Sequence, residues 1–165
     1  MSMQHFQLEH RFPAPPSKLL EVTDSPEFRA FLNEKMSGLV KTEQTILEDT
    51  LARRVKKLRT SAQLNLPLWL ERIVSRFEPH LDQMFQLDRA NLIERIEGNT
   101  VAGRIAATAR YNAAPGNETV RLFEGSYECT VPLVGPTAEK IVWKQIKPMY
   151  DREAELTVQY LQEHL

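Results

Sequence analysis

The polar residues that could do chemistry in this sequence lie inside apolar stretches. In the segment 85–93, Arg89 and Asn91 alternate in step with apolar residues, and Glu153 falls within the apolar arc of a C-terminal helical segment. A charge that is removed from water must be paired or hydrogen-bonded. One interpretation pairs Arg89 with Glu153 at the floor or mouth of a pocket. The other, which we favour, turns Arg89 outward at a bulge and leaves Glu153 at an open rim.

The common catalytic and metal-binding motifs are absent from the sequence. Four histidines (His5, His10, His80 and His164) and one cysteine form neither H-x-x-x-H nor C-x-x-C, and the sequence has no phosphate-binding glycine loop and no nucleophile elbow. We therefore predict no catalytic residue, no metal site and no cofactor. His10 is expected on the core-facing side of its strand, and Cys129 is expected to be a packed, unreactive thiol.

The only charge cluster is the basic run "RRVKKLR" at 53–59. We interpret it as the solvated face of a strand whose cations discourage edge pairing; contact with phosphate or an acidic partner is the alternative. A net charge of −1 gives no overall attraction to nucleic acid or anionic membrane. The longest apolar runs are too short to span a bilayer, the N-terminus does not resemble a signal peptide, and the single cysteine fits a reducing compartment. These features predict a cytoplasmic protein without stable membrane insertion.

Periodicity places these residues on elements of two kinds. Alternating apolar residues predict strands, and apolar residues three and four apart, with proline near the first turn, predict helices. The predicted order is a strand at 5–12, helices at 17–23 and 24–32, two strands within 39–60 around a turn near 48–49, a helix at 67–77, strands at 83–96, 100–112 and 119–133, and a helix at 136–165.

The last helix has a wide apolar arc, so we expect it to be buried along much of its length against a curved sheet. Gly135 and Pro136 allow an abrupt change from strand to helix, and Pro148 inside the helix predicts a kink. Because the connections between strands are of hairpin length, the sheet is predicted to be antiparallel.

Two segments, "FQLEHRFPAPPSKLLEVTDSPEF" and "GSYECTVPLVGPTAEKIV…EAELTVQYL", resemble the two ends of START-like (helix-grip, SRPBCC) domains. The second is similar to a bacterial family of unknown function within that superfamily. The resemblance implies an α+β fold in one domain over 1–165, with a curved antiparallel sheet of six or seven strands around the C-terminal helix and two short helices after the first strand. It also implies a cavity between sheet and helix. Members bind lipids, sterols, polyketides or other apolar molecules; some are cyclases or hydrolases, and some bind partner proteins.

The cavity walls are expected on one face of the last two strands and on the helix that crosses them. The predicted ligand-binding residues are Arg89, Asn91, Ala107, Ala109, Tyr111, Phe123, Tyr127, Cys129, Trp143, Met149 and Glu153. In the alternative, aromatic and methionine side chains of the helix fill the space completely.

The function expected from these features is that of a carrier or sensor for a small lipid-like, sterol-like or polyketide-like molecule. One alternative is a cyclase or hydrolase that uses Arg89, Glu153 or Tyr127. Another is a protein-interaction module that uses the outer sheet face and the basic run at 53–59.

Overall fold

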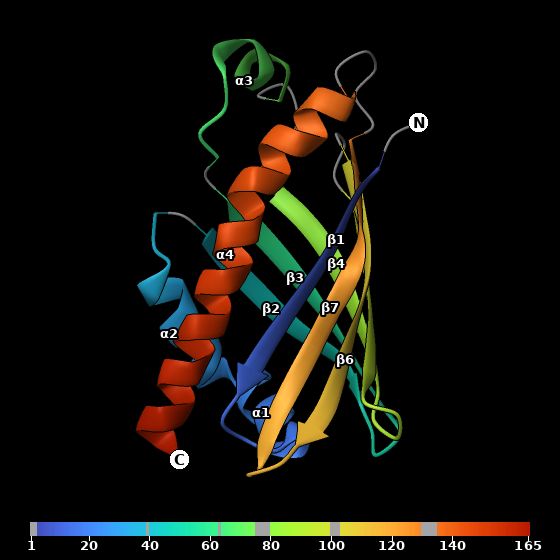
Figure 1. The fold of residues 1–165 in the computed structure, drawn as a ribbon, viewed down its shortest axis with the longest axis vertical. Coiled ribbons are helices and arrows are strands. Elements are labelled where there is room, and N and C mark those ends of the chain that lie inside the picture. The colour runs from blue at the N-terminus through green and yellow to red at the C-terminus, as the bar shows by residue number, and fades with distance from the viewer. Residues whose placement is uncertain (1–2, 39, 63, 75–79, 100–102, 130–134) are drawn as a thin grey trace.

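A computed structural model describes residues 3–38, 40–62, 64–74, 80–99, 103–129 and 135–165. One antiparallel sheet of seven strands, in the order β1-β7-β6-β5-β4-β3-β2, curves around a long C-terminal helix (Figure 1). The elements are β1 Gln4–Phe12, α1 Pro16–Thr23, α2 Pro26–Lys35, β2 Val40–Asp49, β3 Arg53–Ala62, α3 Leu68–Val74, β4 His80–Asp88, β5 Ile93–Asn99, β6 Gly103–Ala114, β7 Glu118–Cys129 and α4 Gly135–His164. This is the helix-grip arrangement that the sequence predicts.

The two short helices begin as their sequences indicate. Pro16 and Pro26 occupy the first turns, where a proline loses no helical hydrogen bond. The hydroxyl of Ser25 accepts a hydrogen bond from the backbone N–H of Phe28 and so caps α2. From there α2 packs against the C-terminal half of α4, where Phe28 meets Tyr160 edge-on at 5.3 Å between ring centroids.

The segment 83–96 is not the single strand that its composition predicts. It contributes to two strands, β4 and β5, joined by a tight turn over 89–92. The carboxylate of Asp88 accepts hydrogen bonds from the backbone N–H groups of Ala90 and Asn91, and Leu92 adopts a left-handed φ of 54°. The turn therefore changes which residues face inward: on β5 these include Glu94, which is buried.

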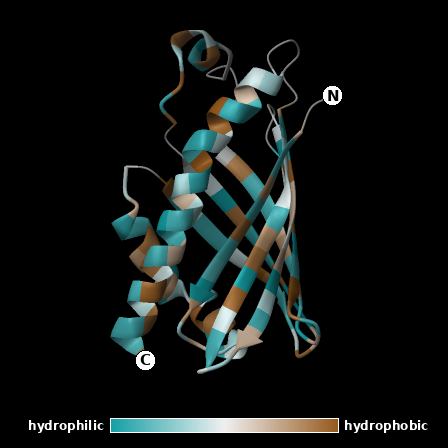
Figure 2. Cartoon of the chain, viewed as in Figure 1, coloured by the Kyte–Doolittle hydropathy of each residue, from teal (hydrophilic) through white to brown (hydrophobic). Residues whose placement is uncertain are grey.

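The helix α4 runs without interruption through Pro148, which lies on an exposed face. Its backbone comes close to β1 and β7, whereas α2 lies over β2 at the other edge of the sheet. Apolar stretches alternate with polar ones along the strands and α4 (Figure 2). The middle strands are thus spanned at a distance by α4 and α2, which leaves room above them for side chains or a ligand.

At its start α4 is tied to the sheet by Glu139, a buried residue whose carboxylate accepts the backbone N–H of Cys129 at 2.9 Å. The turn around Gly135 was predicted as a direct passage from strand to helix, but residues 130–134 lie outside the described part of the chain. Among the described helices, none is both long and apolar enough to cross a membrane.

Candidate ligand cavity

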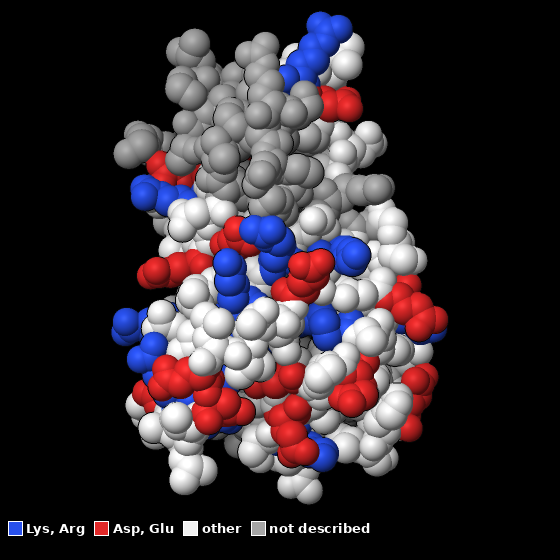
Figure 3. All heavy atoms as spheres, turned by 180° about the vertical axis from the view of Figure 1, so that it is seen from behind, with Lys and Arg blue, Asp and Glu red and all other residues white. Residues whose placement is uncertain are grey.

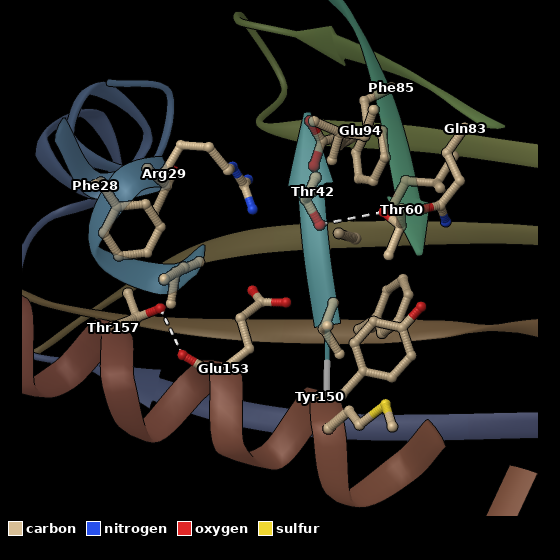
Figure 4. Close-up of a pocket in the computed structure, with 18 of the residues that line it drawn as sticks. Phe28, Arg29, Thr42, Thr60, Gln83, Phe85, Glu94, Tyr150, Glu153 and Thr157 are labelled. Carbon is tan, nitrogen blue, oxygen red and sulfur yellow. Dashed lines mark hydrogen bonds between the residues drawn. The ribbon is translucent and has the colours of Figure 1, made fainter. Parts of the chain in front are cut away.

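A cavity of about 180 Å³ lies between the concave face of the sheet, α2 and the middle of α4 (Figure 4). All seven strands and the helices α1, α2 and α4 contribute to its wall. The apolar wall is formed by Phe12, Leu19, Phe28, Leu32, Met36, Val40, Leu58, Leu81, Phe85, Ile96, Ala109, Phe123, Ile146 and Met149. The polar part is formed by Thr23, Arg29, Asn33, Thr42, Lys56, Thr60, Gln83, Glu94, Tyr111, Arg121, Tyr150, Glu153 and Thr157.

The other end of the concave face is filled by aromatic side chains. Phe6 stacks on Trp143 with 4.5 Å between ring centroids, and Phe123 packs at 5.1 Å against both Phe6 and Tyr150. Ala107 belongs to this packed cluster and does not line the cavity. The structure therefore combines the two alternatives of the sequence: aromatic residues fill the space near the start of α4, and a cavity remains farther along.

A network of buried charges lies on the concave face of β3 and β5 and forms the floor of the cavity. Arg54, only 1% exposed, reaches Asp24 at 2.9 Å and Glu94 at 2.8 Å. Lys56 donates to the same Asp24 at 3.0 Å, and the hydroxyl of Tyr111 donates to Glu94 at 3.0 Å. Burial lowers the pKa of Lys56, with the nearby carboxylates opposing the shift, and burial together with Glu94 raises the pKa of Tyr111 well above its ordinary value.

This network corrects the interpretation of the run 53–59. Every second residue of β3 faces the concave side, so Arg54 and Lys56 are buried while Arg53, Lys57 and Arg59 remain exposed. Moreover, β3 is not an edge strand, since β2 lies outside it. Only half of the run therefore forms a solvated face, and it does not guard an edge.

A second group of polar residues joins β1, β7 and α4. Arg121 donates to Nδ1 of His10 at 3.1 Å and lies 3.6 Å from Glu153, while Nε2 of His10 lies 2.9 Å from the carboxylate of Asp151. The expected core-facing position of His10 is confirmed. Hydrogen bonds from His10 and Lys147 lower the pKa of Asp151.

Five of the residues predicted for the site line the cavity, namely Ala109, Tyr111, Phe123, Met149 and Glu153. Ala107 and Trp143 lie in the filled aromatic cluster. Tyr127 and Cys129 lie at the end of β7, where burial, with Cys129 and Glu139, raises the pKa of Tyr127 to about 12.

Arg89 and Asn91 lie away from the cavity. Arg89 pairs with Asp49 of the neighbouring hairpin, and Asn91 donates to Asp88. The hypothetical pair of Arg89 with Glu153 is therefore wrong. The favoured alternative places Arg89 outward correctly, although a turn and not a bulge is the cause.

The sequence interpretation missed Arg29, Lys56, Gln83, Glu94 and Arg121, all of which line the cavity. The alternation of faces along β3 could have indicated that Lys56 points inward, because Lys56 lies two residues from the apolar Leu58 and shares its face. Glu94 was missed because the unrecognised turn before β5 exchanges the inward-facing and outward-facing residues of that strand. Arg29 lies on the polar side of a short helix, and the sequence carries no mark that this side faces a cavity.

A family model described as "Protein of unknown function (DUF2505)" matches residues 7–161. No curated protein matches the chain.

Among solved structures, a START superfamily protein from Mycobacterium smegmatis is similar with a TM-score of 0.57 and 12% identity, over 96% of this chain and 98% of that one. Norcoclaurine synthase from Thalictrum flavum in complex with dopamine and hydroxybenzaldehyde aligns with a TM-score of 0.60 and 13% identity, over 99% and 89%. The Zhui aromatase/cyclase from Streptomyces sp. R1128 aligns with a TM-score of 0.57 and 11% identity, over 96% and 90%. These similarities show the START-like fold.

Proposed function

Since the chain belongs to the DUF2505 family of proteins of unknown function and has a START-like fold, we propose that it binds a small, largely apolar molecule in the cavity between its sheet, α2 and α4. The observation that carries this proposal is the cavity itself, whose wall combines apolar side chains with convergent polar groups, as small-molecule sites do. A structure of the similar norcoclaurine synthase holds two small aromatic molecules, dopamine and hydroxybenzaldehyde.

The volume limits the size of the ligand. About 180 Å³ is somewhat larger than the roughly 150 Å³ cavity that accepts benzene in an engineered protein, and smaller than the roughly 300–1,000 Å³ of drug-sized sites. A single ring with a short side chain, or a short acyl chain, fits this space. A sterol or a long lipid requires α4 or α2 to move outward.

A carrier or sensor role is favoured over a cyclase or hydrolase because the three polar residues suggested for catalysis do not converge on one place. Glu153 lines the cavity, whereas Arg89 lies at the β4–β5 turn and Tyr127 lies at the end of β7. The charged groups of the cavity floor are paired with one another, so they hold the wall in place rather than present a free acid or base. The location in the cytoplasm stays a prediction from the sequence.

The outer face of the sheet gives less support to a protein-interaction module. Acidic and basic side chains are interspersed on the face opposite the view of Figure 1 (Figure 3), and Arg59 pairs with Asp82 of the neighbouring strand. Such mixed charges are typical of a solvated surface.

The test is a titration of the purified protein with neutral p-cresol, followed by NMR. Backbone amides around Ala109 and Phe123 should shift in a saturable way, and Ala109→Leu should abolish the effect by occupying the cavity. The matched control is Ala106→Leu on the same strand, whose side chain is exposed on the opposite face. Native mass spectrometry of the untreated protein then identifies any bound molecule. Shifts scattered over the surface, or unchanged binding by Ala109→Leu, would contradict the proposal.

A further inference from the structure

The charged groups around the cavity do not balance. The cations are Arg29, Arg54, Lys56 and Arg121, and the carboxylates are Asp24, Glu94 and Glu153. Each of these carboxylates lies within 4 Å of Arg54, Lys56 or Arg121. Among the described residues, Arg29 has neither an ion pair nor a hydrogen-bonded partner for its buried Nε.

Arg29 projects from α2 into the cavity, into the space that Thr42 and Glu153 also face (Figure 4). Burial lowers its pKa, while Glu153 and Asp24 raise it from a distance. An arginine stays charged under such conditions, so the cavity holds a poorly solvated cation with unused donors. The cost of that state falls when an anion occupies the cavity.

Glu153 acts on Arg29 only from a distance and forms no ion pair with it. Its carboxylate lies 3.6 Å from Arg121, and Arg121 is in turn held by His10. The hydroxyls of Thr42 and Thr60 lie 3.3 Å apart, so one donates to the other and one hydroxyl proton stays available beside the cavity. Arginine and a hydroxyl are both donors, and donors without acceptors fit an acceptor-rich group on the ligand.

We propose that the ligand is a small apolar carboxylic acid whose carboxylate is bound by Arg29. The planar guanidinium matches the two oxygens of a carboxylate, and the low dielectric of the cavity strengthens the contact. The apolar remainder lies against the wall that includes Phe28, Phe85 and Met149. This inference rests on the proposed function, because it names the chemical class that the same cavity takes.

The test compares 3-phenylpropanoate with its neutral isostere 3-phenylpropanamide by calorimetry and NMR. The parent protein should bind the acid about tenfold more tightly or better, as expected for a charge-assisted contact. Arg29→Met should remove this preference and leave the affinity for the amide largely unchanged. Lys35→Met, which removes an exposed cation from the end of the same helix, should retain it. In the parent, the Nε–H resonance of Arg29 should shift with the acid and not with the amide, which keeps the test valid if Arg29→Met does not fold.

The outcomes separate the two proposals. Equal affinity of the parent for acid and amide, with both bound in the cavity, overturns the carboxylate inference and leaves the proposed function intact. A preference for the acid that survives Arg29→Met, or an Nε–H signal that does not respond to the acid, overturns the role of Arg29. If neither compound binds at millimolar concentration, the carboxylate inference and the proposed function both fail.

Discussion

Replacing Arg54 with methionine should destabilise the protein by about 3–5 kcal/mol, the usual cost of breaking a buried ion pair by removing one partner. Arg54 is 1% exposed and joins Asp24 on the α1–α2 connection to Glu94 on β5. Asp24 keeps Lys56 in the variant. Most of the loss therefore falls on Glu94, which is 2% exposed and would retain only the hydrogen bond from Tyr111 among its described short contacts.

Urea unfolding monitored by tryptophan fluorescence gives the free energy of each variant. The control is Arg59→Met on the same strand, because Arg59 pairs with Asp82 in a half-exposed setting where such a pair contributes about 0–1 kcal/mol. The double variant Arg54→Met/Glu94→Gln should lose less than the sum of the single variants, since neither charge is then left alone. Equal losses for Arg54→Met and Arg59→Met would refute the assignment of Arg54 to a buried network.

Two other changes test the packing and the pH dependence. Ala107→Leu should lower the free energy of unfolding by about 1–3 kcal/mol because it overpacks the aromatic cluster. Ala109→Leu, whose side chain points into the cavity, should lower it clearly less, and Ala106→Leu is the exposed control. Equal losses for Ala107→Leu and Ala109→Leu in urea unfolding would argue against a cavity. The pKa of Asp151 is lowered in the folded protein, so its ionised carboxylate should stabilise the fold above the ordinary pKa of 3.8, and this stabilisation should be lost as the pH falls through the lowered pKa. The difference in stability between the parent and Asp151→Asn should therefore shrink on acidification. A difference that does not depend on pH would exclude the ionised carboxylate as its source.

Most of the elements could be predicted because local signals agree with the fold. Prolines mark the first turns of α1 and α2, Pro67 directly precedes α3, and alternation marks β1, β6 and β7. The curved antiparallel sheet around the C-terminal helix follows from the START-like arrangement that the resemblance implies. The proline positions and the alternation depend on backbone chemistry and on residue spacing, which a sequence displays directly.

The turn between β4 and β5 was missed because its residues do not interrupt the alternation of apolar and polar positions. Asp88 and Asn91 are residues that favour turns, but Leu92 in a left-handed conformation is not expected from its type. The error moved the inward-facing polar residues from Glu94 to Arg89 and Asn91. A shift of one residue in a strand exchanges its two faces, so a single missed turn was enough to misplace that side of the site.

Arg54 and Arg29, two arginines of the concave side, show why the rest of the site could not be predicted. Arg54 stands in a run of cations that looks solvated, and Arg29 stands on a short helix with polar neighbours; neither context indicates burial. What separates them is the number of carboxylates within reach, two for Arg54 and none for Arg29 among the described residues, and this depends on how α2, β3 and β5 come together. A charge whose partners are supplied by the fold stabilises the fold, whereas a charge left without one keeps its donors available for a molecule from outside. On that argument the same residue type has a structural role on β3 and a binding role on α2.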